Sequence, residues 1–129
     1  MTGDRLLGEA RFQAADEAFL AGLRDWLETP LLGCTPGAVA EAAIVLGELV
    51  TNAFRHARPP FLVRLTLPGP GNAVRMEVHD GTATPATGWP LGKGLLVVRG
   101  LCPDWGVEHR PDGKGVWAEL PLLVAPQAR

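Results

Sequence analysis

The segment VLGELVTNAFRHA, residues 45–57, decides the fold, because its apolar side chains recur with the period of an α-helix. These side chains fall on one arc, which comprises Val45, Leu46, Leu49, Val50 and Ala53. The opposite side carries the polar residues Glu41, Glu48, Asn52 and Arg55. A helix with one apolar face buries that face against another element, so this segment predicts the central helix of a layered domain.

Helix-start and helix-stop signals bound this segment. Thr35 suits an N-cap, and Pro36 suits the first helical position. Pro59 and Pro60 cannot continue a helix, and a residue that precedes proline is biased away from helical geometry. We therefore expect a helix from Thr35 to about Ala57.

Shorter periodic segments flank the helix. Val74, Met76 and Val78 alternate with polar residues, which is typical of a strand with one buried face. Related patterns predict strands at residues 5–13, 61–67, 73–80, 105–109 and 115–120, and helices at residues 15–28 and 94–101. Turn-rich segments after residue 67 and at residues 111–113 predict two hairpins. Helices grouped beside hairpins predict an α+β fold, a two-layer sandwich of a mostly antiparallel sheet against helices.

Length and composition limit the classes of protein. The 129 residues predict one domain, residues 1–129, with a core at about 11–121 and frayed ends. The net charge of −2, with both signs interspersed, argues against a nucleic-acid footprint or a polybasic membrane patch. No apolar run approaches roughly 20 residues, and no signal-peptide pattern is present, so we expect a cytoplasmic protein outside the membrane. Cys34 and Cys102 show no metal-binding spacing, which predicts two reduced, buried thiols.

Glu48 and Asn52 lie four residues apart, so they are neighbours on one face of the central helix. Oxygen ligands suit Mg²⁺, which usually keeps several waters while it bridges phosphates. The Asn52 side-chain oxygen suits this metal, and the Glu48 carboxylate suits a general base. Taken alone, the pair is more typical of a solvated helix face.

Asp80 continues the alternation of Val74, Met76 and Val78, so its side chain is expected on the buried side at the end of the strand. A buried carboxylate is costly unless it is paired. The exocyclic amine of adenine is a suitable donor, whereas guanine offers a carbonyl oxygen at that ring position. Asp80–Gly81 is also a common turn pair, and that alternative stays open.

Gly92–Lys93–Gly94–Leu95 precedes the expected helix at residues 94–101. Glycines let backbone N–H groups approach phosphate closely, and a helix N-terminus favours anions. Lys93 adds a positive charge. The sequence contains neither the P-loop pattern nor the dinucleotide-binding pattern GxGxxG after a strand. A flexible turn explains this segment equally well when it is considered alone.

Together these motifs resemble those of the GHKL ATP-binding superfamily, which includes gyrases, histidine kinases and mismatch-repair ATPases. Residues 45–57 resemble its N-box, and VHDGTATP, residues 78–85, resembles its first glycine box. GKGLLVVRGLCPDWGV, residues 92–107, resembles the second glycine box, and GKGVWAEL, residues 113–120, resembles the last strand. The chain is most similar to the anti-sigma factor and serine protein kinase branch, including short actinobacterial regulators, over residues 11–120.

The resemblance implies a Bergerat-type sandwich that holds ATP and Mg²⁺ between the helices and the sheet. The implied site residues are Glu48 as general base, Asn52 as Mg²⁺ ligand, Asp80 as the reader of adenine, and His56, Gly81, Gly92, Lys93, Gly94 and Leu95 as further nucleotide-binding residues. Members of the branch phosphorylate a serine on an anti-sigma-factor antagonist, and many bind and silence a sigma factor. Apolar surface on the outer sheet or the first helix would also suit a homodimer.

Two departures from the family pattern affect this expectation. The loop at residues 81–91 is short for a lid, and a lid excludes water and completes a phosphate site. Gly115 stands where the family usually has Thr after Gly–Lys. A catalytically inactive module that senses nucleotide or binds a partner therefore remains the alternative to a kinase. A detached histidine-kinase ATPase domain fits less well, because the final strand resembles the anti-sigma branch more closely.

Overall fold

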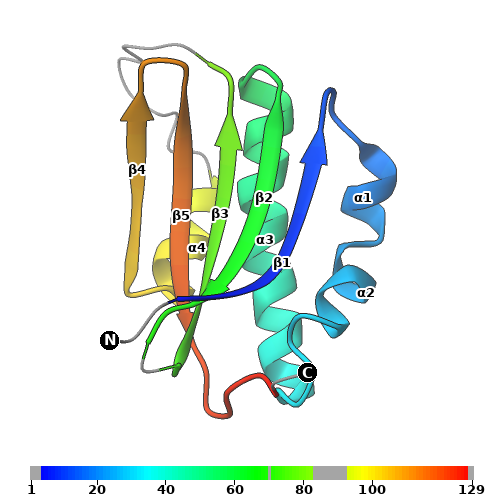
Figure 1. Ribbon diagram of the computed structural model, residues 1–129, viewed down its shortest axis with the longest axis vertical. Coiled ribbons are helices and arrows are strands. Elements are labelled where there is room, and N and C mark those ends of the chain that lie inside the picture. Colours follow the sequence, from blue (N-terminus) through cyan, green and yellow to red (C-terminus); the bar gives the residue numbers. More distant parts are fainter. Residues whose placement is uncertain (1–3, 70, 83–92, 128–129) are drawn as a thin grey trace.

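The computed structural model describes residues 4–69, 71–82 and 93–127 (Figure 1). In these residues, five strands and four helices follow one another in the order β1 (Arg5–Phe12), α1 (Glu17–Ala21), α2 (Leu23–Glu28), α3 (Pro36–His56), β2 (Phe61–Leu67), β3 (Ala73–Asp80), α4 (Lys93–Leu101), β4 (Asp104–Arg110) and β5 (Gly113–Pro121).

The strands form one antiparallel sheet in the order β1-β2-β3-β5-β4. Helices α3 and α4 lie behind this sheet, while α1 and α2 lie beside its β1 edge (Figure 1). The predicted two-layer α+β sandwich is therefore confirmed, as are both expected hairpins, β2–β3 and β4–β5. Because β5 inserts between β3 and β4, the last hairpin brings Lys114, near the start of β5, opposite Asp80 at the end of β3.

Helix α3 forms the centre of the core. Thr35 is its N-cap and accepts a hydrogen bond from the backbone N–H of Ala38 at 3.1 Å, as its sequence position predicts. The apolar arc of α3 is buried and comprises Ala42, Val45, Leu46, Leu49, Val50 and Ala53. These residues belong to the same core as the inward-facing side chains of β2, β3 and β5, among them Val63, Met76 and Ala118. The buried face of the sheet and the buried face of α3 thus pack together in one apolar layer.

The first predicted helix, at residues 15–28, is wrong as a single element. Asp16 caps α1 by accepting a hydrogen bond from the Phe19 N–H at 2.9 Å, but α1 ends at Ala21. Gly22 has φ −98° and ψ 15°, and it serves both as the C-cap of α1 and as the N-cap of α2. Glycine disfavours a helix interior by about 1 kcal/mol, so the chain breaks there although the apolar period continues through Leu23 and Leu27.

Ordered structure extends beyond the expected core at both ends. Strand β1 begins at Arg5, and the Arg5 guanidinium donates to the backbone oxygen of Pro126 at 3.1 Å. After β5, the Gln127 N–H donates to the Leu32 oxygen at 2.7 Å, and the Cys34 thiol donates to the Val124 oxygen at 3.3 Å. The expectation of two buried thiols is wrong for Cys34, which is only partly buried, and right for Cys102, and both are free thiols.

Helix α3 has the length and composition of a membrane-spanning segment, with a mean hydropathy of 1.4, and it is the one such helix in the described residues. The expectation of no such segment overlooked its many small apolar residues. Core helices pass the same test. The apolar arc of α3 packs against the sheet in this fold, so α3 acts as the core helix.

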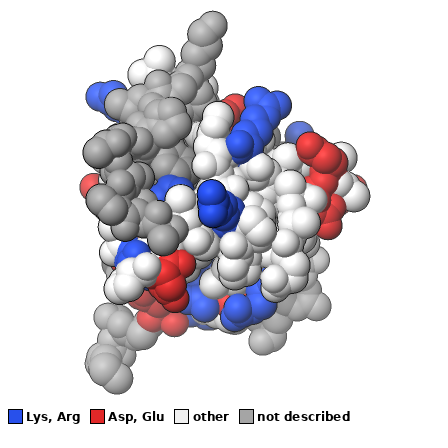
Figure 2. Space-filling model, turned by 90° about the horizontal axis from the view of Figure 1, so that it is seen from above, with Lys and Arg blue, Asp and Glu red and all other residues white. Residues whose placement is uncertain are grey.

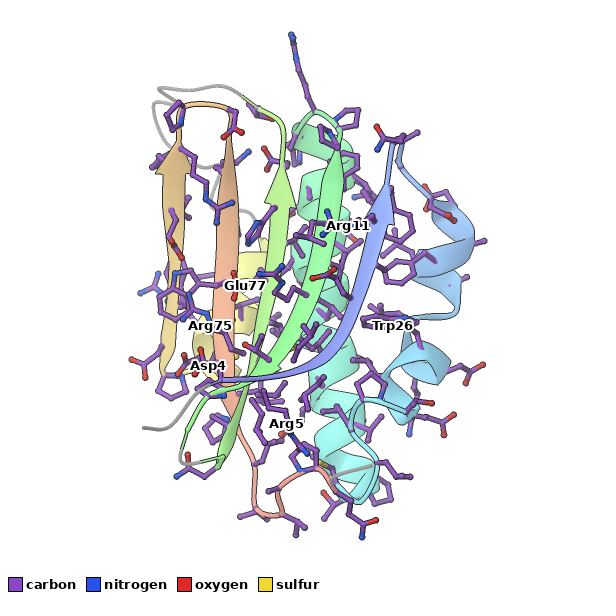
Figure 3. All side chains as sticks on the ribbon, viewed as in Figure 1. Asp4, Arg5, Arg11, Trp26, Arg75 and Glu77 are labelled. Atoms are coloured by element: carbon purple, nitrogen blue, oxygen red, sulfur yellow. The ribbon has the colours of Figure 1, made fainter. Side chains whose placement is uncertain are left out.

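The face of the sheet turned away from the helices carries ion pairs around Arg75 (Figure 3). The Arg75 guanidinium contacts the carboxylates of Glu77, Glu108 and Glu119 at 3.1–3.3 Å and lies 4.1 Å from the ring centroid of Trp117. This face is therefore charged over the centre of the sheet, and not the apolar surface that an outer-sheet homodimer would use.

Glu77 is the most strongly perturbed carboxylate in this network. His79 Nε2 lies 2.8 Å from Glu77 Oε1, and this hydrogen bond, with that from Arg75, lowers the Glu77 pKa from 4.5 to about 2 despite partial burial. A depressed pKa in the folded state stabilises the protein above the unfolded value of about 4.5. That contribution is lost as the pH falls from there through about 2.

We expect Glu77→Gln to lower the free energy of unfolding at pH 7 by about 2–3 kcal/mol, because each pKa unit corresponds to about 1.4 kcal/mol. The loss should shrink as the pH falls toward 2, where wild type also loses the charge. Urea unfolding at pH 7 and pH 3 measures both effects. Glu108→Gln is the matched control: Glu108 contacts the same Arg75, but its side chain is 52% exposed, so it should cost less than about 1 kcal/mol. Equal losses in the two variants would contradict this account.

Candidate functional site

Asp80 lies at the end of β3 with its side chain on the helix-facing side, as the alternation predicts, and that side chain is 1% exposed. The Thr82 N–H donates to Asp80 Oδ1 at 2.8 Å. The ammonium of Lys114 lies 2.8 Å from Oδ2, so the two groups form an ion pair. Each oxygen of this buried carboxylate therefore already has a polar neighbour.

Lys114 is the residue of this site that the sequence analysis missed. It lies opposite Asp80 in the β3–β5 register, and its side chain is only 3% exposed. A usable signal was present, because Val116, Ala118 and Leu120 alternate as buried residues along β5 and Lys114 shares their parity. What the alternation does not provide is the cross-strand register that pairs this lysine with Asp80.

The turn after β3 is joined to the connection between α3 and β2. The Gly81 N–H donates to the Arg58 oxygen at 2.7 Å, and the Arg58 N–H donates to Thr82 Oγ1 at 2.8 Å. A Cβ added at Gly81 would lie 2.4 Å from the backbone oxygen of Pro59. This close approach to the α3–β2 connection alone explains why glycine is required at position 81, and no bound ligand is needed to explain it. It also holds Asp80 at the end of the molecule where α3 terminates.

Asn52 lies on α3 about one turn before that end. Its amide nitrogen Nδ2 is buried and has no hydrogen-bond partner among the described residues. Glu41 occupies the same flank of α3, eleven residues earlier. Burial, and to a smaller extent the nearby Glu41 carboxylate, raise the pKa of Cys102, which lies just after α4, to about 11. The Asn52 flank of α3 therefore faces the α4 side of the helical layer.

Glu48, one turn before Asn52, is half-buried. It lines an open groove that α3 forms with α1 and α2, together with Leu20, Ile44 and Thr51. The structure thus confirms the helical neighbourhood of Glu48 and Asn52, and shows that Glu48 is accessible from this groove. The groove that Glu48 lines and the cavity that Asp80 lines share no lining residue.

The remaining predicted site residues lie at the same end of the fold or outside the described residues. His56 is exposed in the last turn of α3, where a basic side chain suits the helix dipole. Lys93, Gly94 and Leu95 form the first turn of α4, one residue earlier than the predicted helix start. Gly92 lies outside the described residues. The start of α4 provides backbone N–H groups of the kind that bind anions.

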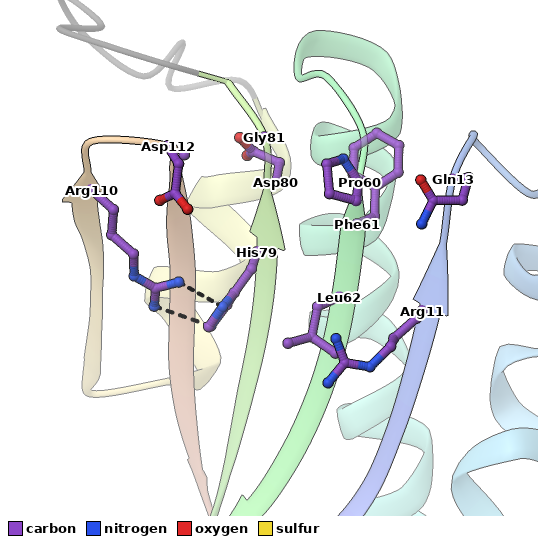
Figure 4. Close-up of a pocket in the computed structure, with 11 residues that line it drawn as sticks. Arg11, Gln13, Pro60, Phe61, Leu62, His79, Asp80, Gly81, Arg110 and Asp112 are labelled. Carbon is purple, nitrogen blue, oxygen red and sulfur yellow. Dashed lines mark hydrogen bonds between the residues drawn. The ribbon is translucent and has the colours of Figure 1, made fainter.

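A second cavity, of about 180 Å³, opens on the opposite face of the sheet and is lined by Arg11, Gln13, Leu62, His79, Arg110 and Asp112 among others (Figure 4). Arg110 donates to His79 Nδ1 at 2.8 Å, which leaves the Nε2 proton of His79 for Glu77. Asp80 and Gly81 also line this cavity, whereas none of its lining residues comes from α3 or α4.

Figure 2 looks down on the end that carries Asp80, and there Lys, Arg, Asp and Glu are scattered among uncharged residues. In residues 4–69, 71–82 and 93–127, no three His, Cys, Asp or Glu side chains form a group that could hold a metal ion on their own. A metal held here by Asn52 would therefore need oxygen ligands from a bound molecule or water, as Mg²⁺ commonly takes from phosphates.

The Asn52 end of the site fits a magnesium nucleotide better than the Asp80 end does. A buried, unpartnered amide N–H at Asn52 is unfavourable unless a ligand satisfies it, so this position fits a hydrogen-bond acceptor such as a phosphate oxygen. With the amide turned the other way, Asn52 would offer its oxygen to the metal. The Asp80 end fits a base less simply, because Lys114 already contacts the carboxylate that adenine would use.

The sequence matches no protein-family model and no curated protein. Among solved structures, the chain is similar to the crystal structure of the RsbU and RsbW domains of Rv1364c from Mycobacterium tuberculosis. The match has a TM-score of 0.66 and 21% sequence identity, and it covers 95% of this chain and 34% of that one. The chain thus spans about a third of the length of that protein. At this identity the likeness shows a shared fold, which is the RsbW-like α+β sandwich.

We expect Gly81→Ala to lower the free energy of unfolding by about 1–3 kcal/mol, because its Cβ would press on the Pro59 oxygen. Gly100→Ala in α4 is the control, since a Cβ there meets nothing within 4 Å and should stabilise the helix by about 0.5–1 kcal/mol. Urea unfolding of both variants compares them. If Gly81→Ala is as stable as wild type, the close approach of the turn to Pro59 is absent.

Proposed function

We propose that the chain is a cytoplasmic regulatory domain that binds ATP with Mg²⁺, of the anti-sigma factor serine/threonine protein kinase type. It would phosphorylate a serine of an anti-sigma-factor antagonist, sequester a sigma factor, or do both. The observation that carries this proposal is the buried, unpartnered amide of Asn52 on the α4-facing flank of α3. The RsbW-like fold and the family-like motifs around Asn52, Asp80 and Gly94 support it.

The residues of this chain would divide the work between binding and proton transfer. Asn52 would hold the metal through its side-chain oxygen, and the N–H groups at the start of α4 would contact phosphate, with Lys93 adding charge. Asp80 would contact the base, with its turn fixed through Gly81 and Thr82. The metal, when bound, would neutralise charge on the phosphates.

Glu48 would act at the acceptor hydroxyl. As the phosphoryl group moves from ATP to the serine oxygen, the hydroxyl proton would pass to the Glu48 carboxylate and ADP would be released. Glu48 is half-buried and borders the groove between α1, α2 and α3, from which a substrate segment could approach it. This exposure is compatible with a protein substrate.

The alternative is a catalytically inactive module of the same fold that senses nucleotide or binds a partner. The specific observation in its favour is the ion pair between Lys114 and Asp80, which engages the carboxylate expected to read the base. The two functions differ in one measurable respect, the transfer of phosphate.

We expect Mg-ATP to raise the melting temperature. A concentration about 100 times the Kd stabilises a protein by about 2.7 kcal/mol, or several degrees for a domain of this size. Asn52→Ala should remove the magnesium-dependent part of the shift, as measured by differential scanning fluorimetry with and without EDTA. Arg55→Ala, an exposed neighbour on α3, should respond as wild type does. If millimolar Mg-ATP does not shift the melting temperature of wild type, the proposal that the chain binds nucleotide is wrong.

We expect Glu48→Gln to keep Mg-ATP binding but to lower phosphoserine formation on the cognate antagonist by about 10²–10⁴-fold, the usual contribution of a general base. Mass spectrometry of the antagonist measures the product. Glu41→Gln, on the same flank of α3, is the control and should leave the rate unchanged. If wild type binds Mg-ATP but neither it nor Glu48→Gln yields phosphoserine, the inactive module is the better description.

A further inference from the structure

The cavity on the outer face of the sheet lies between two arginines from opposite edges of that sheet. Arg11 belongs to β1 and Arg110 to β4, which are the two outermost strands. Figure 4 shows that both side chains extend over the sheet toward its centre, so the two guanidinium groups converge on one cavity. Leu62 lies between them and gives the cavity an apolar floor.

Arg110 is held in place over β5. Its Nη1 donates to His79 Nδ1 at 2.8 Å, and His79 Nε2 lies 2.8 Å from Glu77 Oε1. Between the two strands lies Gly115 of β5, which pairs with His79 in the sheet. A Cβ at Gly115 would lie 3.1 Å from His79 Cδ2 and 3.4 Å from Arg110 Nη2. Glycine at this position, where the family that the sequence resembles usually has threonine, therefore leaves room for the guanidinium.

The charges around the cavity favour an anion. Among residues 4–69, 71–82 and 93–127, no carboxylate forms an ion pair with Arg110. Arg11 pairs with Glu9 at 3.2 Å, but its side chain is 68% exposed, and such exposed pairs are weak. Asp80 also lines the cavity, but its carboxylate is 1% exposed and already ion-paired. Exposed Asp112 is thus the lining carboxylate that opposes an anion.

The size of the cavity limits the ligand to one small group. Its volume of about 180 Å³ is below the roughly 300–1,000 Å³ of sites for drug-sized ligands. A guanidinium presents its N–H donors as a planar fork that matches the oxygens of a phosphate. We propose that this cavity binds a phosphate group between Arg11 and Arg110. The inference does not depend on the proposed nucleotide site, because no lining residue comes from α3 or α4.

Titration of the isotope-labelled full chain with inorganic phosphate, followed by NMR, tests the proposal. The ionic strength is kept constant, because salt screens exposed charges. We expect saturable shifts of the Nε–H signals of Arg11 and Arg110 and of the backbone amides of Leu62 and Gly115. N-acetyl-phosphoserine amide is the second probe. Tighter binding of this ester indicates a phosphate carried by another molecule, tighter binding of inorganic phosphate indicates the free ion, and either result supports the site.

Variants separate a built site from general attraction of anions. Arg110→Gln and Arg11→Gln should each weaken phosphate binding by about tenfold or more, because each removes a charge-assisted hydrogen bond. Asp112→Asn should tighten binding, because it removes the opposing charge. Gly115→Ala keeps every charge but crowds Arg110, so it should also weaken binding, and it provides the test if Arg110→Gln does not fold. Arg99→Gln, exposed on α4, is the control and should bind as wild type does.

Three results would overturn the inference. The first is the absence of a saturable shift with either probe. The second is equal binding by wild type, Arg110→Gln and Arg11→Gln. The third is a set of shifts confined to the first turn of α4, which would place phosphate at the proposed nucleotide site and so support the proposed function while this inference fails. Saturable shifts around Arg110, without any response to Mg-ATP at Asn52, would support this inference while the proposed function fails.

Discussion

The burial of the apolar arc of α3 against the inner face of the sheet is the constraint on which the rest of the structure depends. Six side chains of α3 are buried in one core with Val63, Met76 and Ala118. Burying a Val or Leu side chain contributes about 1.5–3 kcal/mol, so this layer is a major favourable contribution to folding. It also fixes the rotation of α3 and therefore the flank on which Asn52 lies.

The same packing explains why polar groups are buried at one end of the molecule. Asn52 lies at the margin of the α3 arc, and Asp80 ends the buried alternation of β3. Both groups lie on elements that apolar contacts already hold in place. Positioning them for a ligand therefore requires no further ordering of the chain. The two groups differ in that Asp80 has Lys114 and Thr82 as neighbours, whereas the Asn52 amide has no partner in the described part of the chain.

Local patterns in the sequence were sufficient for most of the fold. The strand alternation correctly predicted that Asp80 faces the core, and Thr35 correctly marked the start of α3. The break at Gly22 was missed, because the apolar period runs through it and only backbone geometry shows the interruption. The pairing of Lys114 with Asp80 depends on the register of two strands 34 positions apart, which no local pattern contains. The roles proposed for Glu48 and Asn52 come from family resemblance and remain predictions.

The central claim is that a nucleotide lies between the α3 and α4 layer and the inner face of the sheet. Titration of isotope-labelled protein with Mg-ATP, followed by amide NMR, tests it most directly. The account predicts that the Asn52 side-chain amide, the Gly81 and Thr82 backbone amides and the first turn of α4 shift and saturate together. Shifts confined to Arg11, His79 and Arg110, around the cavity on the outer face of the sheet, would contradict it.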